Sequence, residues 1–131
     1  MTLSTDDQLA IQDLYARYNH AIDSGNGDAW ARTFTPDGTF ASGANTFAGT
    51  EQLTNFAKGF ASRMKARHWT NNLVIEAADG GAKGTCYLML LRLTPGEQPP
   101  AAVMTTALYT DRLVKTADGW RFTNRSVTAD A

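Results

Sequence analysis

The sequence predicts an α+β domain: a cone-shaped α+β barrel in which three N-terminal helices pack on a strongly curved, mostly antiparallel sheet. Two observations lead to this prediction. Apolar residues recur at helical spacing in the first half of the chain, and four long strand-like segments joined by short turns fill the second half. Helices followed by such a run of strands are typical of α+β domains, with the helices on one face of the sheet. A strongly twisted sheet wrapped over helices encloses an interior.

Length and composition favour one globular domain, residues 1–131, with a single core. The net charge is −1, and the basic residues form no stripe, which argues against nucleic acid as a partner. The longest apolar run, residues 87–91, is too short to span a bilayer, and the N-terminus shows no secretory signal. We therefore expect a cytoplasmic protein without a membrane partner. The single cysteine, Cys86, excludes an internal disulfide and a cysteine-based metal site.

The first helix is expected over residues 5–24. Its apolar stripe consists of Ile11, Leu14, Tyr15, Tyr18, Ala21 and Ile22. Tyr18 places a hydroxyl within this stripe, where the group needs a partner. Asp23 places a carboxylate in the last turn, where the helix dipole disfavours it by about 0.3–1 kcal/mol. Asp23 is therefore either a solvated turn residue or one half of a buried acid–base pair whose other half comes from further along the chain.

The remaining elements are expected in the following order. Asp28 caps a short helix over residues 28–34, and the turn-forming sequence Pro36-Asp37-Gly38 ends it. Two short strands and the third helix then span residues 39–41, 46–48 and 49–65. The four long strands of the antiparallel meander span residues 68–77, 83–93, 103–115 and 120–128.

Two histidines are candidates for acid–base chemistry, because imidazole side chains in general change charge near neutral pH. His20 lies off the apolar stripe of the first helix and is expected at the surface. His68 opens the first long strand. An ionised aspartate beside His68 would orient its ring and stabilise its protonated form, and the same contact would offset the unfavourable position of Asp23. From the residues alone, His68 is either such a base or an ordinary residue at a strand edge.

The last long strand carries a further candidate, Arg125. Side chains alternate across a sheet, so one face is expected to carry Trp120, Phe122 and Asn124, and the other Arg121, Thr123, Arg125 and Val127. Arg125 then either projects into the cone to bind an anion or oxyanion, or lies at the surface with its stem over apolar area. Side chains of the middle strands form core or pocket wall: Leu88, Met89, Leu90, Met104, Leu108 and Tyr109.

The sequence lacks the motifs that mark several common classes of enzyme. There is no nucleophile elbow, no phosphate-binding glycine loop and no dinucleotide fingerprint. Two histidines and scattered carboxylates show no metal-ligand spacing. The chemistry that remains is proton transfer in a mostly apolar cavity, with no cofactor and no metal.

Short motifs spread along the chain resemble those of one known family. They are Ala21-Ile22-Asp23-Ser24-Gly25, Asp28-Ala29-Trp30, Phe34-Thr35-Pro36-Asp37-Gly38, Arg67-His68-x-x-x-Asn72, Tyr109-Thr110-Asp111-Arg112-Leu113 and Asp118-Gly119-Trp120-Arg121-Phe122. With these motifs the chain resembles the SnoaL-like branch of the nuclear transport factor two-like superfamily, which includes scytalone dehydratase, lindane dehydrochlorinase and bile-acid dehydratase. The resemblance implies the cone-shaped fold, but it does not imply one function, because this fold hosts many chemistries.

The resemblance also implies roles for particular residues. In these enzymes an aspartate at the end of the first helix pairs with a histidine at the start of the first long strand, and the matching positions are Asp23 and His68. Arg125 resembles an arginine on the last strand of the dehydrochlorinase. The chain departs from the family pattern at Tyr18, which stands near the lysine of the dehydrochlorinase. It departs again at residues 83–93, which lack the second histidine of scytalone dehydratase.

Together these features predict a cofactor-independent lyase of the dehydratase or β-elimination type, acting on a small hydrophobic substrate that is cyclic or aromatic. His68 removes a proton, and Asp23 stabilises the resulting imidazolium. Arg125 and Tyr18 stabilise the departing group or an enolate-like oxygen. The expected substrate-binding residues are Phe34, Phe56, Trp69, Asn72, Leu88, Met104 and Tyr109.

Two alternative functions stay open, and a homo-oligomer is expected. The same pair of residues suits an isomerase or a polyketide-type cyclase, and a non-catalytic small-molecule-binding protein is the alternative from a different class. The outer sheet face commonly packs against another subunit in this fold, so the resemblance implies a homo-oligomer, either a dimer or a trimer.

Overall fold

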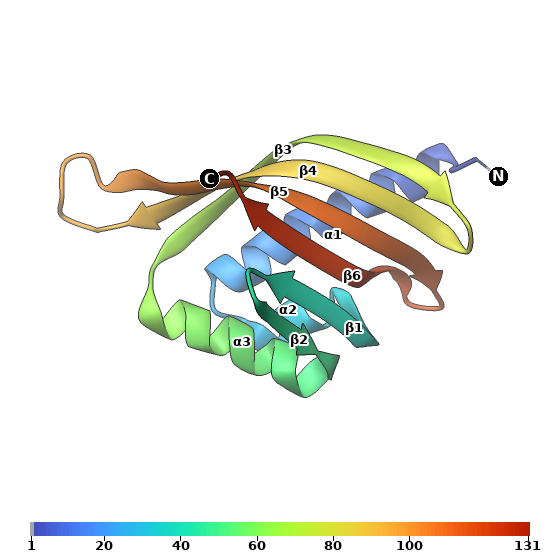
Figure 1. Cartoon of the computed structure of the whole chain (residues 1–131), viewed down its shortest axis with the longest axis horizontal. Coiled ribbons are helices and arrows are strands. Elements are labelled where there is room, and N and C mark those ends of the chain that lie inside the picture. The colour runs from blue at the N-terminus through green and yellow to red at the C-terminus, as the bar shows by residue number, and fades with distance from the viewer. Residues whose placement is uncertain (1) are drawn as a thin grey trace.

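The computed structural model describes residues 2–131, which fold into helices lying on one side of a long, curved sheet (Figure 1). The elements in chain order are α1 (Thr5–Asp23), α2 (Gly27–Ala31), β1 (Phe34–Ser42), β2 (Asn45–Ala48), α3 (Gly49–Arg63), β3 (Ala66–Ala78), β4 (Gly81–Leu93), β5 (Ala101–Thr116) and β6 (Gly119–Ala129). The α+β prediction is confirmed. In residues 2–131, no helix is both long and apolar enough to cross a membrane.

The six strands form one open sheet in the order β2-β1-β6-β5-β4-β3. All neighbouring strands are antiparallel except β1 and β6, which run parallel. Figure 1 shows α1 crossing beneath the four long strands, while α2 and α3 lie with β1 and β2 below it. The interior therefore lies between α1, α3 and the concave face of the sheet.

Helix α1 forms because capping and periodicity agree along its whole length. The Ser4 hydroxyl accepts a hydrogen bond from the Asp7 backbone N–H at 3.0 Å, and Asp6 and Asp7 lie in the first turn. The predicted apolar stripe is buried as a whole: Ile11, Leu14, Tyr15, Tyr18, Ala21 and Ile22. After the helix, Gly25 adopts a φ of +76°, which turns the chain away. Asp23 is thereby the last residue of the helix.

Several expected boundaries differ from the structure, most of all around α2, β1 and the end of α3. Asn26, rather than Asp28, caps α2, and Phe34 belongs to β1 instead of to the helix. The Pro36-Asp37-Gly38 sequence does not separate a helix from a short strand. It produces an irregular stretch within β1, where the register against β6 shifts between Phe34 and Thr39. Helix α3 ends before the predicted residue 65, because Met64 is already extended, with φ of −158°.

The predicted alternation of β6 is wrong at its centre, and this changes which side chains reach the interior. Leu113 of β5 pairs with Phe122 and Arg112 pairs with Asn124, so Thr123 is the extra residue of a β-bulge. Because the bulge shifts the alternation by one residue, Phe122 and Arg125 both point into the core and are fully buried. Strict alternation had placed them on opposite faces.

Candidate functional site

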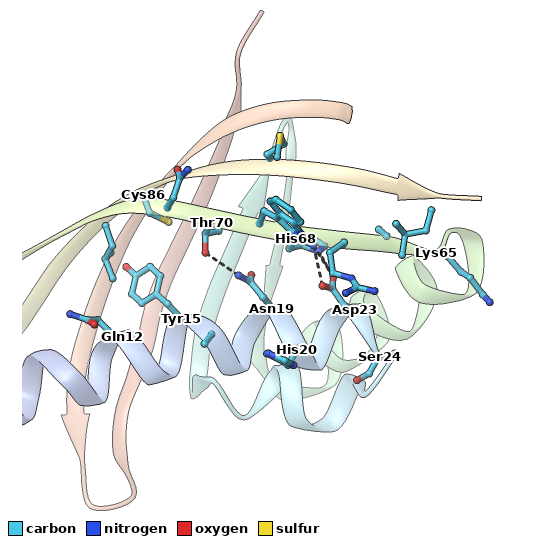
Figure 2. Close-up of a pocket in the computed structure, with 18 residues that line it drawn as sticks. Gln12, Tyr15, Asn19, His20, Asp23, Ser24, Lys65, His68, Thr70 and Cys86 are labelled. Atoms are coloured by element: carbon cyan, nitrogen blue, oxygen red, sulfur yellow. Dashed lines mark hydrogen bonds and ion pairs between the residues drawn. The ribbon is translucent and has the colours of Figure 1, made fainter. Parts of the chain in front are cut away.

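The Asp23 carboxylate and the His68 imidazole meet where the end of α1 approaches the start of β3 (Figure 2). His68 Nδ1 lies 2.6 Å from Asp23 Oδ1. The backbone N–H of His68 also donates to the carboxylate, at 3.0 Å to Oδ2 and 3.2 Å to Oδ1. The side chains are 6% and 15% exposed for His68 and Asp23, respectively. The helix dipole disfavours a carboxylate at the C-terminus of α1. These hydrogen bonds offset that unfavourable interaction.

This geometry selects one tautomer of the neutral His68 ring. A carboxylate is a hydrogen-bond acceptor, so the ring proton lies on Nδ1 and points at Asp23. The lone pair is then on Nε2, for which residues 2–131 provide no hydrogen-bond partner. An imidazole held in this way can accept a proton at Nε2, and the adjacent carboxylate stabilises the imidazolium that results.

The His68 side chain lies between two hollows of different character. One is a largely apolar cavity of about 480 Å³ between α1, α3 and the concave sheet face. Its wall includes Tyr18, Ile22, Phe40, Phe56, Phe60, His68, Leu88, Leu90, Tyr109 and Val127. The other is an open groove of about 970 Å³ between α1 and β3. Figure 2 shows this groove, with Gln12, Asn19 and Asp23 on the helix side and His68 and Thr70 on the strand side.

A buried charged cluster lies next to the apolar cavity. Arg125 Nε is 3.1 Å from Asp111 Oδ1, and both side chains are fully buried. The Tyr15 hydroxyl donates to Asp111 Oδ2 at 2.5 Å. Burial raises the pKa of Asp111, and Arg125 opposes that rise. Burial is the largest single effect and lowers the pKa of Arg125, but the neighbouring acidic groups, Asp111 foremost, together raise it above its ordinary value, so the guanidinium stays charged.

A model of the SnoaL-like domain matches residues 4–126, nearly the whole chain. The chain belongs to the SnoaL-like family. Solved structures of other proteins have the same fold. An aspartate-to-asparagine variant of Rv3472 from Mycobacterium tuberculosis, described as of unknown function, is 30% identical over 93% of this chain and 70% of that chain, with a TM-score of 0.86.

Two further structures share the SnoaL-like architecture over almost their full lengths. ActVI-ORFA from Streptomyces coelicolor is 25% identical, with 96% of this chain and 98% of that chain covered and a TM-score of 0.86. A protein from Catenulispora acidiphila, solved in complex with S-DNPA, is 28% identical, with coverages of 97% and 96% and a TM-score of 0.85. A search of curated protein sequences found no significant match.

The SnoaL-like fold brings together some of the predicted site residues. The Asp23–His68 contact is present, and Tyr18, Phe56, Leu88 and Tyr109 line the apolar cavity. These side chains come from α1, α3, β3, β4 and β5, so their meeting depends on how α1 and α3 cross the sheet.

Other predicted site residues lie elsewhere. Arg125 lines neither the cavity nor the groove, because the bulge in β6 turns it into the core beside Asp111. Phe34 is also a core residue, with its ring 5.1 Å from that of the fully buried Trp30. Neither side chain is placed to contact a molecule in the cavity.

Three more predicted substrate-binding residues lie outside the cavity. Trp69 is 57% exposed, because it follows the inward-facing His68 and so points to the other face of β3. Met104 is 48% exposed and lies an odd number of positions before the inward-facing Tyr109. Asn72 is exposed, with φ of +54°, in the irregular stretch of β3.

The sequence interpretation did not include Asp111 or Phe60 among the site residues. Asp111 has a recognisable signal, because it lies two positions after Tyr109 on a strand and so shares its inward face. Phe60, whose ring centroid is 5.6 Å from that of His68, lies on the predicted apolar face of α3. Among residues 2–131, no group of three or more His, Cys, Asp or Glu side chains is arranged to hold a metal ion.

Proposed function

We propose that this SnoaL-like protein is a cofactor-independent enzyme that moves a proton within a small hydrophobic substrate, with His68 as the base. The observation that carries this proposal is the 2.6 Å contact between Asp23 and His68 at the wall of a 480 Å³ apolar cavity. We favour this cavity over the larger groove as the substrate site, because its wall is largely apolar and therefore suits a hydrophobic substrate.

The proposed reaction begins when His68 Nε2 removes a proton from a carbon next to an activating group. The C–H electron pair passes to that activating group, and Asp23 stabilises the imidazolium. Loss of a hydroxide or halide from the neighbouring carbon then completes a β-elimination. General-base catalysis of this kind contributes about 10²–10⁴-fold, so binding and orientation in the cavity supply the remainder of the rate enhancement.

The family and its members support a broader class, small-molecule enzymes of the polyketide cyclase or isomerase type. The Catenulispora acidiphila structure in complex with S-DNPA supports a small-molecule ligand.

Within this class of small-molecule enzymes, we propose a lyase of the dehydratase type as the lead reaction. An isomerase or cyclase is the second candidate, because the same base can return its proton to another carbon. A non-catalytic binding protein is disfavoured, because the Asp23 side chain is only 15% exposed and the cavity is not filled by side chains.

The test is a screen of small cyclic ketones, alcohols and halides with the native protein and a His68→Ala variant. Native protein is expected to convert a substrate that His68→Ala leaves unchanged, with circular dichroism confirming that both are folded. His20→Ala is the matched control, because His20 is exposed on α1, and it retains activity. Mass spectrometry separates the reactions, since a lyase product has lost water or a hydrogen halide and an isomerase product keeps its mass. Unchanged turnover by His68→Ala would refute the base assignment.

We also propose that two or more copies associate through the outer face of the sheet. Tyr87 of β4 pairs in register with Leu108 of β5, and both side chains point outward, 55% and 37% exposed. Trp69 of β3 lies on the same face, 57% exposed. Large apolar side chains gathered on one exposed face are typical of a protein–protein interface.

A further inference from the structure

A third hollow, away from the apolar cavity, is lined by three arginines. It has a volume of about 370 Å³ and lies between α1, α2 and the start of β6. Arg17 comes from α1, Arg32 directly follows α2, and Arg121 belongs to β6. Among the described residues 2–131, the ten that line this arginine hollow include no Asp and no Glu. Positive charge is therefore concentrated here, although the net charge of the chain is −1.

Most N–H donors of these arginines remain open to a ligand. A guanidinium group carries five such donors. Arg17 uses Nε on Asp13 Oδ2, at 2.6 Å, in an exposed ion pair. Arg121 donates from Nη1 and Nη2 to two nearby backbone oxygens, at 2.7 and 3.0 Å, which holds its side chain in place. Arg32 forms no ion pair with an Asp or Glu of residues 2–131.

The charge balance of the arginine hollow favours a doubly charged anion. Three guanidinium groups and the one carboxylate paired with them, that of Asp13, leave a net charge of +2. A phosphate monoester carries a charge of about −1.5 to −2 at pH 7, so it nearly neutralises this excess, whereas a single carboxylate neutralises half of it. Guanidinium groups also match phosphate oxygens with pairs of parallel N–H donors.

The rest of the wall suits an organic group attached to that anion. Leu14 and Ala21 of α1 are buried core residues that line the hollow, and Ala29 of α2 adds a third apolar side chain. A volume of about 370 Å³ is within the range of small-molecule pockets, roughly 300–1,000 Å³. The arginine hollow therefore offers a charged part and an apolar part to one ligand.

We propose that the arginine hollow binds a small organic phosphate. Arg17, Arg32 and Arg121 donate to the phosphate oxygens, and the organic group packs against Leu14 and Ala21. In the described chain the arginine hollow and the apolar cavity have no lining residue in common, so this site is separate from the proposed active site. The proposal goes beyond the proposed function and does not depend on it.

Isothermal titration calorimetry with phenyl phosphate tests this proposal. Native protein is expected to bind phenyl phosphate at least about tenfold more tightly than benzoate, which has one charge, or inorganic phosphate, which has no apolar group. Arg32→Gln and Arg121→Gln are each expected to weaken binding by about tenfold or more, because each removes charged hydrogen bonds. Arg92→Gln is the matched control, since Arg92 is exposed on β4 outside the hollow, and it keeps the native affinity.

Circular dichroism checks that the variants are folded, and Arg32→Gln is the decisive one because Arg32 is exposed and its loss breaks no ion pair. No binding by native protein, or native affinity in both Arg32→Gln and Arg121→Gln, overturns the proposal. Equal affinity for benzoate overturns the assignment to a phosphate. His68→Ala is expected to bind phenyl phosphate as the native protein does. Binding that is lost in His68→Ala and kept in both arginine variants overturns the arginine hollow as the site, and leaves the base assignment standing.

Discussion

At the scale of single residues, the contact with His68 accounts for the presence of the Asp23 carboxylate at the end of α1. A carboxylate at a helix C-terminus is unfavourable by about 0.3–1 kcal/mol, and a histidine opening an edge strand is ordinary. The sequence identified both positions because one was anomalous and the other was the single histidine placed to complement it. The three hydrogen-bonding contacts from His68 to Asp23 are the physical reason that the anomaly is tolerated.

The first prediction follows from this contact. Asp23→Asn keeps the shape of the side chain but removes the charge that stabilises the imidazolium and selects the ring tautomer. We expect turnover to fall by about 10²–10⁴-fold and the free energy of unfolding to fall by about 1 kcal/mol. Turnover assays and urea unfolding measure the two effects. Asp28→Asn, an exposed residue of α2, is the control and changes neither quantity appreciably. Full activity in Asp23→Asn would contradict the role given to the carboxylate.

At the scale of elements, helical and strand periodicity correctly predicted the existence and order of α1, α3 and the four long strands. Local patterns did not predict where the strands become irregular. The extra residue Thr123 in β6 is visible only in the pairing of β6 with β5, where Leu113 pairs with Phe122 and Arg112 with Asn124. This one-residue shift in register decided that Arg125, rather than Asn124, shares the core face with Phe122.

The start of α1 is attached to the sheet through Asp7, which gives a pH prediction. The Asp7 carboxylate accepts hydrogen bonds from Lys115 Nζ at 2.9 Å and Trp120 Nε1 at 3.0 Å. These bonds hold the pKa of Asp7 below its ordinary value of 3.8. Because the folded-state pKa is lowered, the stabilisation is present above pH 3.8 and is lost as the pH falls through the lower, folded-state value.

We therefore expect Asp7→Asn to unfold more readily near neutral pH and to lose less stability on acidification than the native protein. Urea unfolding between neutral pH and about pH 2 measures both slopes. Asp13→Asn is the matched control, because its ion pair with Arg17 is exposed on the same helix and contributes little. Parallel curves for Asp7→Asn and the native protein would count against this attachment.

The close approach of β4 to α1 gives a packing prediction. A Cβ atom on Gly84 would lie 2.0 Å from the Tyr15 hydroxyl oxygen, which its hydrogen bond to Asp111 holds in place. Gly84→Ala is expected to destabilise the fold by about 1–3 kcal/mol, measured from the urea midpoint. Gly59→Ala in α3 is the control, since its Cβ would approach only the flexible end of Arg63, and it should stabilise by about 0.5–1 kcal/mol. Equal stabilities of the two variants would be inconsistent with this packing.

At the scale of the whole molecule, the outer sheet face predicts self-association. Light scattering is expected to give a mass that is a multiple of 14.2 kDa. Leu108→Lys places a charge at the centre of the apolar face and should yield a folded monomer, with an unchanged circular dichroism spectrum. Leu9→Lys is the control, because Leu9 is 57% exposed on α1, away from this face. A native monomer, or a Leu108→Lys variant that still associates, would contradict self-association through this face.

The sequence by itself determined most of the secondary structure, the SnoaL-like resemblance and the two residues of the Asp23–His68 contact, because periodicity, capping and an unfavourable helix-terminal charge are local properties. Only the tertiary structure decided which side chains share the interior. A bulge buried Arg125 beside Asp111, and strand alternation sent Trp69 and Met104 outward. The bulge depends on register between distant strands, whose energy arises from cross-strand packing that no local pattern contains. Alternation along a strand is local, but which face is buried depends on the helices that pack against the sheet.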